Sequence, residues 1–260
     1  MKISKISNGV YIGTSGWQYK HWQGVFYPDD LEQKDLFSYY TRFFKTVEIN
    51  SSFYHLPKKA TFAGWAKNSP EDFLYALKVW RRITHLKKLK NIGDDLNIFY
   101  ERASVLGKKF GPLLFQFPPS FKAREETMKR LEKLGQLIRV NSRANSRKFA
   151  SKQCAFEFRH ASWFSKKVYE ILRKYNLSLA WADTPSYPYK EEVTADYVYI
   201  RLHGHEVLYG SKYTLAQLKE YARKIKKLRN LGKDVYVYFD NDARGYAVKN
   251  AKELKCLLKL

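Results

Sequence analysis

The sequence has few of the features that mark a secreted, disulfide-rich or membrane-spanning protein. Its 260 residues include two cysteines, Cys154 and Cys256, which lie far apart and form no CxxC pair. Neither a disulfide framework nor a zinc ribbon is therefore expected. No apolar run approaches the roughly 20 residues of a transmembrane helix, and the amino terminus lacks the apolar block of a signal peptide. We expect a cytoplasmic protein with no membrane contact.

Acidic residues are scarce as well. The chain has 25 Asp and Glu against 48 Lys and Arg, which gives a net charge of +23. Such an excess attracts polyanions, but the basic residues are spread over expected helices, as is typical of solvated helix faces. A nucleic acid or a phosphorylated partner stays open as the alternative. The densest basic run, Arg81–Lys90, is the best candidate for phosphate contact.

What the sequence does contain is a repeated alternation of short apolar runs with longer amphipathic stretches. Eight runs are expected to be strands: Val10–Thr14, Thr46–Ser51, Phe73–Val79, Pro112–Phe117, Cys154–Phe158, Leu177–Ala182, Tyr197–Leu202 and Val235–Phe239. Helical periodicity marks Asp30–Phe44, Glu125–Ile138, Leu215–Leu231 and Tyr246–Leu258. Eight strand–helix units predict an α/β protein, a (β/α)8 TIM barrel that forms a single domain over residues 1–260. The basic stretch Arg139–Phe149 is predicted to be an exposed loop.

Strand alternation predicts which side chains point into the barrel. The inward residues near the carboxyl ends of the strands are expected to be Glu48, Asn50, Lys78, Trp80, Gln116, Glu157, Arg159, Trp181, Asp183, Tyr199, Arg201, His203, Tyr236, Tyr238 and Asp240. Removing a charge from water costs several kcal/mol, whereas a whole domain is stable by only ~5–15 kcal/mol. We therefore favour a functional pocket at this face, where barrel enzymes hold their chemistry. A purely structural ion-pair network is the alternative.

Residue chemistry assigns roles within this pocket. The catalytic candidates are Glu48, Glu157, Asp183, His203 and Asp240. The substrate-binding candidates are Trp17, Asn50, Tyr54, Lys78, Gln116, Arg159, Arg201 and Tyr238. Glu157 or Glu48 would act as the base and His203 as its proton partner. Lys78 is interpreted as a fixed positive charge in preference to a Schiff-base lysine.

Two further features of the pocket are left open by the sequence. Glu48, Asp183, Asp240 and His203 resemble an oxygen-rich site for a divalent cation such as Mg²⁺ or Mn²⁺, so a metal cofactor is possible and its identity is unknown. The loop after the first strand is aromatic, with Trp17, Tyr19, Trp22, Phe26 and Tyr27. It could roof the pocket and stack on a sugar or base, or it could pack on itself.

Several motifs in this order resemble the YecE-like family, domain of unknown function seventy-two. The matching residues are Gly13-Thr14-Ser15-Gly16-Trp17 with Trp22 and Phe26-Tyr27-Pro28, Val47-Glu48-Ile49-Asn50 with Ser52-Phe53-Tyr54, Gln116-Phe117-Pro118-Pro119, Glu157-Phe158-Arg159 with Ser162-Trp163, Arg201-Leu202-His203-Gly204, and Tyr238-Phe239-Asp240-Asn241-Asp242 with Asn250-Ala251. The resemblance covers nearly the entire chain. It implies a TIM barrel and a loose relation to sugar isomerases. Asp240 stands where the resemblance leads us to expect Asn.

Three functions are consistent with these observations. The favoured hypothesis is an enzyme, isomerase-like or hydrolytic, that acts on a small polar or anionic substrate such as a sugar or sugar phosphate. The second is a protein that binds nucleic acid or processes phosphodiesters through its basic surface. The third is a non-catalytic barrel whose interior charges only pair with one another.

Overall fold

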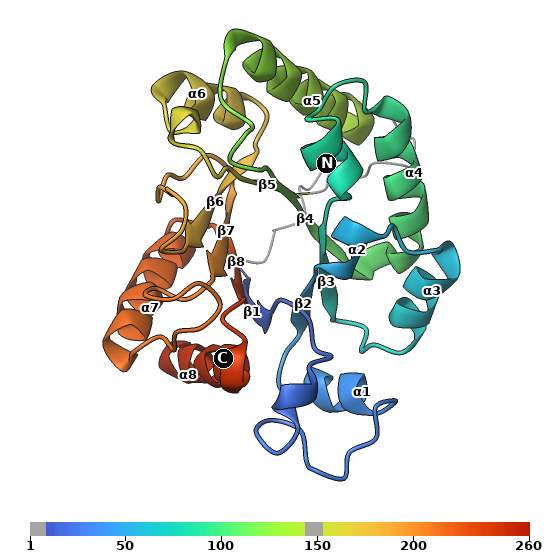
Figure 1. Cartoon of the computed structure of the whole chain (residues 1–260), viewed down its shortest axis with the longest axis vertical. Coiled ribbons are helices and arrows are strands. Elements are labelled where there is room, and N and C mark those ends of the chain that lie inside the picture. The colour runs from blue at the N-terminus through green and yellow to red at the C-terminus, as the bar shows by residue number, and fades with distance from the viewer. Residues whose placement is uncertain (1–8, 144–152) are drawn as a thin grey trace.

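Eight parallel strands surrounded by helices make up the architecture of the computed structural model, which describes residues 9–143 and 153–260 (Figure 1). The strands are β1 Val10–Thr14, β2 Thr46–Ile49, β3 Leu74–Lys78, β4 Phe110–Gln116, β5 Cys154–Glu157, β6 Ser178–Asp183, β7 Tyr197–Leu202 and β8 Asp234–Phe239. The α-helices are α1 Leu36–Thr41, α2 Ser51–Tyr54, α3 Lys59–Lys67, α4 Gly93–Ala103, α5 Glu125–Arg143, α6 Lys166–Lys174, α7 Leu215–Asn230 and α8 Tyr246–Leu258. The predicted (β/α)8 TIM barrel is confirmed. No helix within the described ranges has the length and apolar content needed to cross a membrane.

The strands form one sheet in the order β1-β8-β7-β6-β5-β4-β3-β2. Only β1 and β2 lack a continuous ladder, and between them a single parallel bridge joins Ser15 to Glu48. The barrel therefore has a seam at the place where its first two strands meet.

Tyr40 of α1 closes this seam with its side chain. Its hydroxyl accepts a hydrogen bond from the Thr14 amide at 3.1 Å and donates one to the Thr46 carbonyl at 3.0 Å. Gly13 makes the approach of the two strands possible, because a Cβ atom there would lie 2.2 Å from the Thr46 oxygen. A tyrosine hydroxyl thus satisfies backbone groups that a ladder would otherwise pair.

The barrel interior below the charged residues is filled by aromatic and small side chains. The buried members of this cluster are Ala76, Leu114, Ala155, Ala180, Ala195, Tyr197, Tyr199, Tyr236 and Tyr238. Tyr11 stacks on Tyr236 with ring centroids 4.9 Å apart. Tyrosine fills this space well because its ring is apolar and its hydroxyl can reach a partner. The predicted inward orientation of the β7 and β8 tyrosines is consistent with this packing.

The predicted orientation of β6 is wrong. Ala180 belongs to the interior cluster, so Trp181 and Asp183 face the opposite way. The Trp181 indole donates to the Glu192 carbonyl at 3.1 Å, and Asp183 accepts from Tyr221 of α7 at 2.8 Å. Tyrosines from β7 and β8 occupy the adjacent interior, so alanines fit there and the indole packs under the helices.

Two helix boundaries also differ from the prediction. The helix expected over Asp30–Phe44 is limited to α1, because the Gln23 side chain donates to carbonyls of Pro28, Asp29 and Leu31 and holds that segment in turns. Helix α5 continues to Arg143, so the first part of the predicted loop Arg139–Phe149 is helical. The rest of that predicted loop lies outside the described residues.

Candidate active site

Arg201 is the centre of the candidate site. It lies near the carboxyl end of β7, and alternation turns it inward with only 1% of its side chain exposed. Its Nη2 donates to Glu48 Oε1 at 2.7 Å and its Nε to Glu48 Oε2 at 2.9 Å, a bidentate pair. Its Nη1 donates to Glu157 Oε2 at 2.7 Å, and Nη2 also approaches Asp240 Oδ2 at 3.0 Å. We call Arg201, Glu48, Glu157, Asp240 and His203 the Arg201 network.

The Glu48 carboxylate is fully enclosed within this network. Besides its hydrogen bonds from Arg201, it accepts one from Ser15 Oγ at 2.5 Å and one from Tyr199 Oη at 2.7 Å. The side chain has no exposed surface. With these oxygens occupied, Glu48 holds Arg201 in place, and it is poorly placed to receive a proton from a substrate.

Glu157 of β5 forms the second arm of the network. It accepts from Gln116 Nε2 at 2.7 Å and from Arg159 Nε at 2.9 Å, in addition to Arg201. Burial alone would raise the pKa of Glu157, but Arg201 and Arg159 outweigh burial and hold that pKa well below its ordinary value. Glu157 is therefore ionised at neutral pH, and it orients Arg159.

His203 and Asp240 form the third arm. His203 Nε2 lies 3.0 Å from Arg201 Nη1, and because a guanidinium can only donate, this nitrogen must accept. The pattern assigns the imidazole proton to Nδ1, which lies 2.9 Å from Asp240 Oδ2 without the alignment of a straight hydrogen bond. Burial raises the pKa of Asp240, but Arg201 and His203 lower it by more, so the pKa lies below its ordinary value.

Asp240 also differs from the other network carboxylates in its exposure. Its side chain is 13% exposed, whereas those of Glu48 and Glu157 are almost completely buried. Both network contacts made by its carboxylate use Oδ2. Oδ1 is therefore left without a partner in the network.

Lys78 lies beside the network at the end of β3. It is 8% exposed, and its Nζ sits 4.3 Å from the centre of the Phe53 ring. Within the described ranges, no carboxylate comes within salt-bridge distance of this ammonium group. Burial and then the positive charge of Arg201 lower the pKa of Lys78 to about 8, despite the opposing effect of the nearby carboxylates.

Arg159 and His85 lie near Lys78, and we call these three residues the cationic rim. The Arg159 guanidinium lies 4.4 Å from the centre of the Tyr187 ring, and its two terminal nitrogens make no hydrogen bond to another described residue. His85 packs edge-on against Phe53, with ring centroids 4.8 Å apart. Burial and the charges of Lys78 and Arg159 lower the pKa of His85 to about 4, so it is neutral at pH 7. The rim thus offers two cations and one neutral imidazole.

Asp183 is not part of this assembly. It accepts from Tyr221 and lies 3.1 Å from His205 Nδ1, on the helix side of β6. The predicted Mg²⁺ or Mn²⁺ set is therefore not brought together, since Arg201 already occupies Glu48 and Asp183 faces away. Among residues 9–143 and 153–260, no group of three or more His, Cys, Asp or Glu side chains is placed to hold a metal ion.

Three predicted binding residues also lie apart from the network. Tyr238 is fully buried below it, with its hydroxyl 2.7 Å from Thr46 Oγ1. Tyr54 is 58% exposed beyond Phe53. Trp17 is buried against Phe37, at a centroid distance of 4.9 Å. Tyr238 is thus too deeply buried to contact a ligand in the charged site. The contacts of Tyr54 and Trp17 are with other aromatic side chains and not with the network.

Most of the aromatic first loop packs on itself and on α1 and does not form a roof. Trp22, Phe26 and Tyr27 are buried, and Phe26 contacts Tyr39, Tyr40, Phe43 and Phe44. Tyr19 is the member closest to the charged site, since its hydroxyl donates to the Ser15 carbonyl. Of the two interpretations that the sequence left open, the structure therefore agrees with a loop that packs on itself.

A cavity of about 240 Å³ adjoins the network at the seam between β1 and β2. Ser15, which binds Glu48, and Asn50 line it together with Trp17 and Trp65. Asn50 Oδ1 and Trp17 Nε1 are buried and have no hydrogen-bond partner among residues 9–143 and 153–260. Of the predicted binding residues, Asn50 and Trp17 thus line this cavity.

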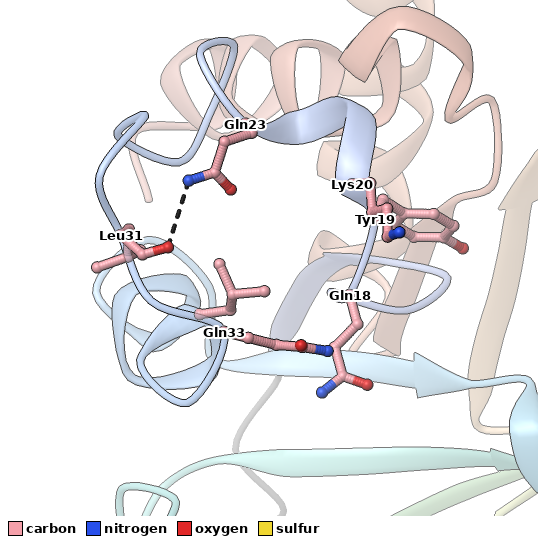
Figure 2. A pocket seen from close by; sticks show the side chains of 7 residues that line it. Gln18, Tyr19, Lys20, Gln23, Leu31 and Gln33 are labelled. Carbon is pink, nitrogen blue, oxygen red and sulfur yellow. Dashed lines mark hydrogen bonds between the residues drawn. The ribbon is translucent and has the colours of Figure 1, made fainter.

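Figure 2 shows a second cavity, of about 180 Å³, within the first loop. Gln18, Gln23 and Gln33 surround it, and the Gln23 amide donates to the Leu31 carbonyl across the loop. Because this amide supports the loop backbone, we interpret the cavity as a feature of loop packing.

Sequence reasoning did not assign a site role to Ser15, Tyr199, His85 or Asp242. Tyr199 could have been found, since it precedes Arg201 by two residues on the same strand face. Asp242 follows Asp240 by two residues, and burial together with Asp240 raises its pKa to about 6 against the opposing effect of His21. Ser15 and His85 lie after strand ends, where alternation no longer gives direction.

The basic run Arg81–Lys90 is partly used by the fold. Arg82 Nε donates to Asp95 Oδ1 at 2.7 Å, and Lys87 Nζ donates to Asp95 Oδ2 at 2.5 Å. Burial of Asp95 is outweighed by these cations, which hold its pKa below the ordinary value. Two members of the proposed phosphate-binding run therefore anchor α4.

The fold and this site define a class: a single TIM barrel whose C-terminal face holds a buried network of charges with a cationic rim. A family model described as "Protein of unknown function DUF72" matches residues 11–260. The chain belongs to this family, which confirms the YecE-like resemblance.

Known relatives match the whole chain or part of it. The UPF0759 protein YunF of Bacillus subtilis is 27% identical, over 96% of this chain and 95% of its own length. The UPF0759 protein YecE of Escherichia coli K12 is 30% identical over 45% of this chain and 40% of its own length. Among solved structures, the DUF72 family protein TM1631 of Thermotoga maritima has a TM-score of 0.83 at 30% identity, over 97% of this chain and all of its own. EF0366 of Enterococcus faecalis, at 21% identity, has a TM-score of 0.80, with 96% of each chain covered. None of these names states a reaction.

Proposed function

We propose that this protein is an enzyme that acts on a small polar or anionic substrate, such as a sugar or sugar phosphate, by acid/base chemistry at the C-terminal face of its barrel. The observation that carries the proposal is the convergence of three carboxylates with Arg201, Arg159 and Lys78. Deeper in the same barrel, tyrosines and alanines fill the interior. Replacing buried ion pairs by apolar residues is often neutral or stabilising, so stability alone does not account for this network.

Exposure assigns the roles. Asp240 is the acid/base candidate, because it is the most exposed carboxylate of the network and because Arg201 and His203 contact only its Oδ2. Arg159 is the first candidate to bind a negative group on the substrate, since its terminal nitrogens make no hydrogen bond to another described residue and can bind a carboxylate or phosphate. Glu48 and Glu157 act as positioning residues in this proposal, because Arg201 and other donors occupy their oxygens.

Solvent-deuterium exchange tests the proposal. The full chain is incubated in D₂O with a panel of aldoses, ketoses and their phosphates, and exchange at carbon is followed by mass spectrometry. The wild-type protein is expected to exchange or convert at least one compound, and Asp240→Asn to lower the rate by about 10²-fold or more, in line with the loss of an acid/base group. Glu132→Gln, which removes an exposed carboxylate paired with Lys174, serves as the matched control.

The same measurement separates the enzyme from a non-catalytic barrel. If no compound in the panel binds or reacts, and Asp240→Asn changes only the unfolding midpoint, the ion-pair network is structural and the proposal is wrong. Wild-type turnover that survives in Asp240→Asn would instead remove Asp240 from the mechanism.

The net charge of +23 supports a second candidate, a protein that binds nucleic acid. Binding through phosphate contacts weakens steeply as salt rises, because counterions are released. Titration of a labelled DNA or RNA duplex at increasing sodium chloride tests this candidate. An affinity that does not change with salt would count against it.

A further inference from the structure

We propose that Lys78 is a nucleophile that forms an imine with a small aldehyde or ketone carrying a carboxylate or phosphate group. This inference rests on the proposed function and names the substrate class of the same site. It replaces the interpretation of Lys78 as only a fixed positive charge.

The position of Lys78 is the first argument. Leu74 and Ala76 pack with the interior cluster, so Lys78, two residues further along β3, faces the barrel mouth. Its ammonium group rests on the Phe53 ring at 4.3 Å. The backbone beneath it is fixed, because Ser52 Oγ donates to the Lys78 carbonyl at 2.7 Å. The amine is thus held at the end of a strand, near enough to the network for Arg201, Glu157, Glu48 and Asp240 to act on its charge.

The side chain of Lys78 is also buried without a hydrogen bond or ion pair to any residue that the structure describes. Lys109, another partly buried lysine, donates to the carbonyls of Ala66 and Ser69, both at 2.6 Å. Lys87 pairs with Asp95. Lys78 has only the face of an aromatic ring, and the carboxylates of the network are directed at Arg201. A buried lysine that lacks an ion pair is costly to keep, so a chemical use of the free amine explains its presence.

The charges around Lys78 favour the neutral amine. Burial and Arg201 lower the pKa of Lys78 to about 8, while Glu157, Glu48 and Asp240 oppose the shift. His85 adds no positive charge at pH 7, because its pKa is about 4. At pH 7 about a tenth of Lys78 is unprotonated, roughly 300 times the fraction of a lysine with an ordinary pKa. The neutral amine is the form that attacks a carbonyl.

The rest of the rim indicates what the carbonyl compound carries. Arg159 presents unused terminal nitrogens and is backed by Tyr187. Together with Lys78 it favours a ligand with a negative group, since Asp240 is the only network carboxylate with appreciable exposure. A compound with an aldehyde or ketone at one end and a carboxylate or phosphate at the other matches this arrangement.

The step balances without an added oxidant or reductant. The Lys78 nitrogen pair attacks the carbonyl carbon, and the carbonyl electron pair moves to oxygen, which takes up a proton. The resulting carbinolamine loses its hydroxyl group as water, using one proton from the nitrogen and forming the C=N bond. Amine and carbonyl compound therefore give imine and water. The protonated imine then withdraws electrons from the neighbouring carbon, where Asp240 Oδ1 can accept a proton.

Reductive trapping tests the inference. The full chain is treated with glyoxylate, a small aldehyde that carries a carboxylate, and sodium cyanoborohydride at pH 7, and modified lysines are identified by peptide mass spectrometry. Lys78 is expected to be modified at least about tenfold faster than the exposed Lys20. Equal or slower modification of Lys78 would overturn the proposal.

Two variants separate the nucleophile from the anion site. Lys78→Arg keeps the positive charge but cannot form an imine, so it is expected to bind inorganic phosphate like the wild type and to lose the adduct. Arg159→Leu is expected to weaken phosphate binding, measured as the shift of the unfolding midpoint, and to slow trapping at Lys78. If the wild type binds phosphate through Arg159 but traps no adduct at Lys78, the nucleophile is excluded and the proposed function stands. If it neither binds phosphate nor traps an adduct, both proposals fail.

Discussion

At the scale of single residues, the effect of each buried charge on stability depends on the groups that pair with it. Arg201 pairs with three carboxylates, of which Glu48 and Glu157 have almost no contact with water. Lys78, a short distance away, lacks any such pairing within the described part of the chain. Two buried cations on the same barrel face therefore have opposite effects on stability.

Replacement of Arg201 by Met is expected to be strongly destabilising. It leaves Glu48 and Glu157 buried without their main cation, and breaking a buried pair in this way costs about 3–5 kcal/mol. The free energy of unfolding from urea titration measures the loss. Arg201→Lys keeps the positive charge but not the bidentate geometry, so it should lose less stability than Arg201→Met. A loss below about 1 kcal/mol for Arg201→Met would show that the network contributes little.

Replacement of Lys78 by Met is expected to stabilise the protein at pH 7. The folded-state pKa of Lys78, about 8, lies below its ordinary value of 10.5, so the folded state binds this proton more weakly than the unfolded state. The free energy of unfolding is therefore highest above pH 10.5, where Lys78 is neutral in both states. It decreases as the pH falls through 8, by about 3 kcal/mol at most. Urea titrations at pH 7 and pH 10 measure it. Between pH 7 and pH 10 the free energy of unfolding of the wild type should increase relative to that of Lys78→Met. An equal pH dependence of the two proteins would contradict the prediction.

At the scale of secondary-structure elements, the seam between β1 and β2 is the exceptional feature. Elsewhere each strand has a parallel neighbour on both sides, and here one bridge and a tyrosine from α1 replace the ladder. Helix α1 therefore completes the sheet as well as covering it.

Tyr40→Phe tests this element. The change deletes only the hydroxyl and leaves the Thr14 amide and the Thr46 carbonyl buried without that partner, which costs about 1–3 kcal/mol. Hydrogen exchange of the Thr14 amide should become faster at the same time. Tyr39→Phe is the matched control, since no hydrogen bond of its hydroxyl supports the seam. Equal stability of the two variants would mean that water replaces the Tyr40 hydroxyl.

At the scale of the whole molecule, the net charge of +23 acts on the fold itself. Like charges repel and disfavour the compact state, and salt screens this repulsion. Exposed ion pairs, such as Lys45–Asp72, contribute little individually. Screening should therefore stabilise the barrel on balance.

The unfolding midpoint is expected to rise by a few degrees between about 0.02 M and about 0.5 M sodium chloride. Differential scanning fluorimetry measures it. Sodium phosphate at equal ionic strength should raise the midpoint further if the Arg159 rim binds anions. A midpoint that falls with salt would show that ion pairs outweigh the overall repulsion.

The sequence by itself determined the eight strands, since each strand is a short apolar run bounded by polar residues. The helix expected between the sixth and seventh strands is absent, because β6 leads to β7 through described residues that form no helix. The sequence also determined the inward position of Glu48, Glu157 and Arg201, because every second residue of a barrel strand faces the interior. These inferences need only local periodicity.

The tertiary structure alone decided what depends on neighbours far along the chain. The orientation of β6 follows from tyrosines of β7 and β8 that fill the space beside it, so Asp183 faces α7. The isolation of Lys78 follows because Arg201 attracts the carboxylates that lie nearby. Periodicity gives the direction of a side chain but not its partner, and partners decide which buried charge is stable and which is free to react.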